Sequence, residues 1–181
     1  MTPPTARISV WTGERFACIK IVGRANFTSS VDFKTLIQEL MRRNCLCFVL
    51  DLSECVLMDS TFLGVLTGFG LKLSGGDANQ SQQGIELLNP SPRIIELLDT
   101  LGVLHFFRIA QGNFSPPADS QPVECAPSIP SRTELNITSL EAHQTLMDVN
   151  PANIAKFKDV AQFLAEGLRN SKQGGGVKRD S

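Results

Sequence analysis

The stretch Met58-Asp59-Ser60-Thr61-Phe62-Leu63-Gly64-Val65 decides the fold. It follows an apolar run, Leu46 to Leu52, that predicts a buried strand, and it opens an apolar segment that predicts a helix to about Leu73. A polar Asp-Ser-Thr cluster is therefore expected where a helix begins. Such a terminus carries unpaired N–H groups and partial positive charge, so it stabilises an added phosphate. A hydroxyl there gains about −1.5 to −2 charges on phosphorylation, and Ser60 is the candidate.

Strands and helices are predicted to alternate on both sides of this turn. Strands are expected at Ile8–Trp11, Phe16–Val22, Leu46–Leu52, Ile85–Leu88 and about His105–Ile109; helices are expected from a cap at Ser29 or Ser30 to about Arg43, from Ser60 to about Leu73, and from Asn89-Pro90-Ser91-Pro92 to Gly102. The segment 23–27 is expected to be a loop. The order ββαβαβαβ predicts an α/β domain with a mixed, mostly parallel sheet.

Two glycines stand out in the second predicted helix. Gly64 and Gly68 fall on one face, and each costs roughly 1 kcal/mol relative to alanine in a helix. Their presence indicates a close approach by another backbone or a partner surface. Tight packing on the domain's own sheet explains them equally well.

Bulk composition restricts the class of protein. The 181 residues carry 17 Lys+Arg against 18 Asp+Glu, a net charge of −1, so nothing favours a nucleic-acid or anionic-membrane partner. No apolar run reaches the roughly 18 residues of a membrane helix, and Met1–Arg7 lacks a signal-peptide core, so a cytoplasmic location is expected. The five cysteines include Cys45-Leu46-Cys47 but no Cys-x-x-Cys, and we predict neither a metal nor a cofactor.

The chain is predicted to consist of a domain at 1–111, a Pro/Ser-rich linker at 112–135, a helical extension at 136–171 and a disordered tail at 172–181. In the extension, Thr138 and Glu141 have capping-box spacing, and Asn150-Pro151 predicts a second helix start. That helix carries an apolar stripe, made of Ile154, Phe157, Ala161, Leu164 and Leu168 and widened by Val160 and Phe163. The stripe must be buried against its own domain, a second copy or a partner.

The domain resembles the STAS family, and most closely its bacterial anti-sigma factor antagonists. The resemblance rests on Phe48-Val49-Leu50-Asp51-Leu52-Ser53, on Met58-Asp59-Ser60-Thr61-Phe62-Leu63-Gly64, and on Ile85-Glu86-Leu87-Leu88-Asn89-Pro90-Ser91-Pro92 with Leu98 and Leu101-Gly102-Val103. It covers about Arg7 to Ala110. Phe62 departs from the family, which usually has Gly at that position and so leaves more room near the serine.

The resemblance implies a non-enzymatic signalling module. The unphosphorylated domain would bind an anti-sigma factor with serine kinase activity and so regulate sigma-factor-dependent transcription. Phosphorylation of Ser60 would end that binding, and a phosphatase would restore it. Asp59 would shape the turn, and the docking surface would comprise Thr61, Phe62, Leu63 and Gly64. The extension would mask this surface, bind a target or form a homodimer.

Three alternatives remain open from the sequence. Ser60 could simply cap its helix, or Asp59 could do so and leave Ser60 free. The domain could instead be a subunit docked on an ABC-transporter ATPase, without phosphorylation. An enzyme is disfavoured, because His105 and His143 have no partner at a recognisable spacing and the chain has neither a Gly-x-Ser-x-Gly elbow nor a phosphate loop.

Overall fold

The computed structural model describes residues 5–75 and 83–174. Its elements are β1 (Arg7–Thr12), β2 (Phe16–Ala25), α1 (Phe27–Arg42), β3 (Cys47–Asp51), β4 (Cys55–Met58), α2 (Ser60–Ser74), β5 (Gly84–Leu88), α3 (Pro92–Thr100), η1 (Leu104–Phe106), β6 (Phe107–Ala110), β7 (Val123–Glu124), α4 (Arg132–Val149), η2 (Pro151–Asn153) and α5 (Ile154–Gln173). The predicted tail beyond residue 174 and most of the predicted loop between α2 and β5 lie outside the described residues.

The predicted mixed, mostly parallel α/β sheet is confirmed. Its strand order is β6-β5-β3-β2-β1-β7, with β4 beside β2. β1 pairs antiparallel with both β2 and β7, and the other pairings are parallel. Among the described residues, no helix has the length and apolarity to cross a membrane.

Four details of the predicted elements are wrong. The order ββαβαβαβ omits β4, which is only four residues long and pairs with the end of β2 after a register shift at Gly23/Arg24. That pairing extends β2 to Ala25, so most of the predicted 23–27 loop is strand. His105 lies in η1 because β6 begins two residues later, at Phe107.

The fourth correction concerns helix caps. The cap of α1 is Asn26 rather than Ser29 or Ser30; its side chain accepts from the Ser29 N–H at 3.1 Å, and the Asn26 N–H donates to Ser29 Oγ at 3.0 Å. The capping box of α4 is Ser131 with Glu134, about two turns before the predicted Thr138 and Glu141. An Asn or Ser that receives an N3 backbone N–H satisfies a donor left unpaired at a helix start.

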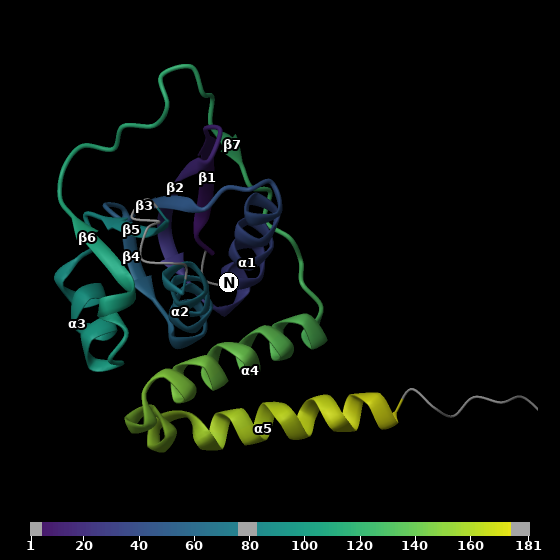
Figure 1. The fold of residues 1–181 in the computed structure, drawn as a ribbon. Coiled ribbons are helices and arrows are strands. Elements are labelled where there is room, and N and C mark those ends of the chain that lie inside the picture. Colours follow the sequence, from purple (N-terminus) through teal and green to yellow (C-terminus); the bar gives the residue numbers. More distant parts are fainter. Residues whose placement is uncertain (1–4, 76–82, 175–181) are drawn as a thin grey trace, which may run out of the picture.

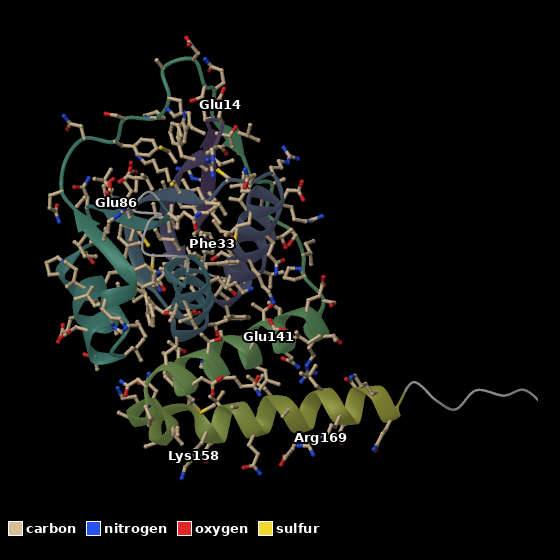
Figure 2. The ribbon with its side chains drawn as sticks, in the orientation of Figure 1. Glu14, Phe33, Glu86, Glu141, Lys158 and Arg169 are labelled. Atoms are coloured by element: carbon tan, nitrogen blue, oxygen red, sulfur yellow. The ribbon has the colours of Figure 1, made fainter. Side chains whose placement is uncertain are left out.

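The core lies between the sheet and the pair α1 and α2. The rings of Phe33 and Phe62 are 4.8 Å apart between centroids, and Phe33 and Phe69 are 6.4 Å apart. The predicted inward stripe of α2 is confirmed, since Phe62, Leu66, Phe69 and Leu73 are all buried. Figure 2 shows Phe33 in the interior beside these helices.

The two C-terminal helices lie outside this core. α4 crosses α1 and α2 on the side away from the sheet, and α5 runs beside α4 as the outermost layer (Figure 1). Asn150 caps η2 through the Ala152 N–H at 3.1 Å, with Pro151 following, as predicted. The α4–α5 pair therefore touches the domain mainly through α4.

Candidate functional site

Asp59 fixes the start of α2. One carboxylate oxygen accepts from the Phe62 N–H at 2.9 Å, and the other accepts from the Phe27 N–H at 2.6 Å. The same side chain thus caps α2 and satisfies a donor at the start of α1. Burial raises the pKa of Asp59, and these two backbone donors oppose the rise because they stabilise the carboxylate.

Ser60 is not the cap of its helix. It is the first helical residue, and with Asp59 in the capping position its hydroxyl makes no capping hydrogen bond. Ser60 Oγ instead lies 2.9 Å from Nε2 of His143 in α4. Of the two local possibilities left open by the sequence, the structure selects the one in which aspartate caps and serine faces another element.

The contact continues along α2 and α4. Thr61 Oγ1 lies 3.1 Å from Ser139 Oγ, and either hydroxyl can be the donor. A Cβ added to Gly64 would stand 2.5 Å from the carbonyl oxygen of Ala142, closer than real atoms approach. The prediction that Gly64 admits another backbone is confirmed, and that backbone belongs to α4.

Gly68 behaves differently from Gly64. A Cβ added there would meet only the Thr145 side chain, at 3.9 Å, which is ordinary contact. The tight approach of α4 is therefore concentrated at the first turn of α2. We call Ser60, Thr61 and Gly64 the Ser60 face.

His143 is buried in this contact, only 5% exposed, with its ring centroid 5.0 Å from that of Phe157 in α5. Burial lowers the pKa of His143, while the Ser139 backbone and the Asp59 carboxylate favour the charged imidazole. Its Nδ1 is buried and makes no hydrogen bond of normal geometry within the described residues. An unsatisfied buried nitrogen costs free energy, so the contact is not ideal for this side chain.

A serine hydroxyl on a histidine nitrogen is also half of a nucleophilic catalytic arrangement. A full triad would place a carboxylate on Nδ1 to orient the imidazole. Within residues 5–75 and 83–174, Nδ1 has no such partner, and the nearby Asp59 carboxylate is bound by two backbone N–H groups. The pair as built provides a polar contact between two helices.

The structure places the remaining predicted site residues in two groups. Thr61 and Gly64 are buried beneath α4. Phe62 is fully buried and packs on Phe33, and Leu63 is 2% exposed. With the helix in this arrangement, Phe62 supports α2 from the core side.

Sequence reasoning missed the residues of α4 that meet the Ser60 face. They are Ser139, Ala142 and His143, spaced i, i+3 and i+4 so that they share one face of a helix. The only signal in the sequence is a small residue flanked by polar ones on a helix of weak amphipathicity. This pattern predicts a contact only once it is known that Ala142 lies opposite Gly64.

The chain is similar to the solved structure of the anti-sigma factor antagonist SpoIIAA in its unphosphorylated form, with 14% identity, a TM-score of 0.46, and coverage of 60% of this chain and 89% of that chain. No protein-family model matches the sequence. No curated protein matches it either. A TM-score of 0.46 at 14% identity is too low to transfer residue roles or partners to this chain.

Proposed function

We propose that this protein is a signalling module that binds an anti-sigma factor with serine kinase activity through the Ser60 face. Phosphorylation of Ser60 ends the binding, and a phosphatase restores it. Sigma-factor-dependent transcription is therefore active when Ser60 is unphosphorylated, because the anti-sigma factor is then bound. The observation that carries the proposal is that Asp59 caps α2, which leaves the Ser60 hydroxyl free to contact another element, here His143 of α4.

The chemistry of phosphorylation suits such a face. A phosphate would add about −1.5 to −2 charges within a contact where Thr61 and Gly64 allow close approach and where Asp59 already carries a partly buried carboxyl group. Like charges in an interface cost several kcal/mol, and about 2.7 kcal/mol changes affinity roughly 100-fold. Phosphorylation would therefore remove the partner without refolding the domain.

The proposed roles of the site residues follow from their positions. Asp59 positions the first turn, Thr61 and Gly64 make the partner contact, and Phe62 and Leu63 hold α2 against the core. This assignment narrows the docking surface expected from the sequence to one side of the helix.

The test is an affinity capture from native cell extract with Ser60→Ala and Ser60→Asp as paired baits, read by mass spectrometry. Because α4 lies on the Ser60 face, a second pair of baits adds Ala142→Arg, which places a large side chain against Gly64. Gln144→Arg, on the exposed side of the same helix, is the matched control. A serine kinase of the ATPase type on the Ser60→Ala baits and absent from the Ser60→Asp baits supports the proposal.

Two outcomes would overturn it. Equal capture of a transporter ATPase by both members of a pair would assign the domain to transporter docking. Failure of every bait to capture a kinase would leave the Ser60 hydroxyl as a contact to His143 without a switching role.

A further inference from the structure

The chain carries its own occupant for the Ser60 face. We propose that the α4–α5 pair is a releasable cover, that α4 stands in for a helix of the partner, and that the fitting partner helix has a small residue opposite Gly64 with polar residues beside it. The identity of the partner rests on the proposed function above; the existence of the cover does not.

The shape of the face selects a helix with a small side chain. Gly64 leaves room for the backbone of Ala142, whose carbonyl oxygen would lie 2.5 Å from a Cβ at position 64. On either side, Ser139 pairs with Thr61 and His143 pairs with Ser60. One turn of helix thus supplies a small residue and two polar groups to three matching positions on α2, which is the pattern a competing helix must reproduce.

The cover is attached through α4, which packs on both α2 and α1, and Val149 and Phe157 are partly buried against the core. In α4, the apolar side chains fully buried against the core are Ala142 and Leu146. At its C-terminal end, the Asn150 and Asn153 amides donate to the Leu101 carbonyl at 3.1 and 2.9 Å. Elsewhere an ion pair joins Glu141 to Lys34 of α1 at the surface, where such pairs contribute little.

Several features make the closed state less stable than an ideally packed contact would be. His143 Nδ1 and Asn153 Oδ1 are buried without hydrogen-bond partners in the described part of the chain. A pocket of about 120 Å³ remains between α1, α2 and α4, bordered by Gly64, Gly68 and Thr145. This pocket is partly open to solvent, so α4 does not fill the groove beside α2 completely. The connection to the domain, residues 111–131, contains the two-residue strand β7 and is also held by Phe114 against Trp11, by the Cys125 N–H on the Ile8 carbonyl and by Ser128 on Asp32. The α4–α5 pair can therefore move about the short segment after Ser128 without unfolding the sheet.

Closure also protects Ser60 from phosphorylation. In the transfer, Ser60 Oγ forms a bond to the γ-phosphorus of ATP, the bond to the β-phosphate oxygen breaks, ADP leaves, and the hydroxyl proton passes to a base of the kinase. Reacting atoms must approach to roughly 3–3.5 Å in line, and α4 occupies that approach. The kinase must therefore act on the open form. A phosphate then opposes closure, because Ser60 Oγ and His143 Nε2 are only 2.9 Å apart.

The first experiment needs no identified partner. The probe is a fluorescein-labelled peptide of residues 131–150, made helical by a hydrocarbon staple between positions 144 and 148, both exposed in the structure. Its binding is measured by fluorescence anisotropy to the full chain carrying Ala142→Arg, which opens the cover, and to the unchanged chain. Asn153→Ala is a second, milder opening variant, because its amide bonds Leu101 and Leu146.

We expect the opened chains to bind the peptide at least roughly tenfold more tightly than the unchanged chain, because a closed state lowers apparent affinity by the fraction that is open. A peptide carrying Ala142→Arg should not bind. Equal binding to opened and unchanged chains, or no binding to either opening variant, would overturn the cover.

A disulfide lock tests the regulatory part. Thr61→Cys with Ser139→Cys puts two thiols where hydroxyl oxygens lie 3.1 Å apart, a separation that side-chain adjustment can convert to a disulfide. The oxidised lock should neither bind the peptide nor accept phosphate from the captured kinase, and reduction should restore both. Each single variant in the same oxidant controls for the five native cysteines. Phosphorylation of the oxidised lock would contradict the proposal.

The two proposals can fail separately. If the peptide binds the opened chains but no kinase is captured, the cover is supported and the proposed function fails.

Discussion

Ser60 and Ser91 both lie at helix starts in this domain, and they have different roles. At α3, Ser91 is the N-cap and its hydroxyl accepts from the Ile94 N–H at 3.3 Å. At α2, Asp59 has that position and Ser60 follows it, so the serine hydroxyl contacts His143 of another helix. Moving the serine by one position changes it from a structural cap into a contact group. Both helices need a cap, whereas the Ser60 hydroxyl serves only the group that lies opposite it.

The first prediction tests whether the start of α2 is shaped for an approaching helix. Gly64→Ala should lower the free energy of unfolding by about 1–3 kcal/mol, because its new methyl group would overlap the Ala142 carbonyl. Gly68→Ala should raise it by up to about 1 kcal/mol, because alanine favours helix and meets only Thr145 at 3.9 Å. Urea denaturation measures both. Similar effects from the two substitutions would show that α4 does not define the face.

The second prediction compares the caps directly. Asp59→Ala should cost about 2 kcal/mol, at the upper end for a cap, because Phe62 and Phe27 both lose an acceptor. Ser91→Ala should cost about 1 kcal/mol. Ser60→Ala should leave the hydrogen exchange of the Phe62 N–H unchanged and accelerate exchange in α4, because only His143 loses a partner. Faster exchange at Phe62 in Ser60→Ala would mean that Ser60 supports the cap after all.

The third prediction concerns how stability depends on pH through His143, which contacts Ser60 at α2 and has no counterpart at Ser91 of α3. The pKa of His143 is lowered in the folded state, so the unfolded state binds more protons as pH falls below about 6.5, and stability should decline from pH 7.5 to 5.5. Asp59, the charged group that faces it, has a raised pKa and affects stability nearer its ordinary value of 3.8. The unfolding midpoint should lose this decline in His143→Gln and keep it in His105→Gln. A decline that persists in His143→Gln would place its origin elsewhere.

The sequence predicted the parts of this site that depend on local rules. Alternating apolar segments gave the sheet and the inward face of α2, and the Asp-Ser order gave the two possible caps. The glycine at position 64 also indicated a close neighbour. The identity of that neighbour could not be predicted, because His143 lies 83 residues from Ser60 and contacts of that kind depend on how α4 crosses α2. β4 was missed for a related reason, since four apolar residues become a strand only beside the end of β2.

The smallest predicted effect lies on the outer surface of the cover. The expectation that the apolar stripe of α5 is buried is wrong for most of its members: Ala161 is buried, but Ile154 is 46% exposed. Val160 and Phe163, which the sequence added to that stripe, are 38% and 71% exposed. Phe163→Ser should therefore change the free energy of unfolding by less than about 0.5 kcal/mol, as expected for an exposed position. Sedimentation equilibrium then tests the predicted homodimer through the C-terminal helix: this substitution should reduce a dimer mass to that of a monomer. If the mass does not change, α5 does not join two copies through Phe163. The α4–α5 pair of the same chain would then be the cover that must leave before the Ser60 face is exposed, with no second copy involved.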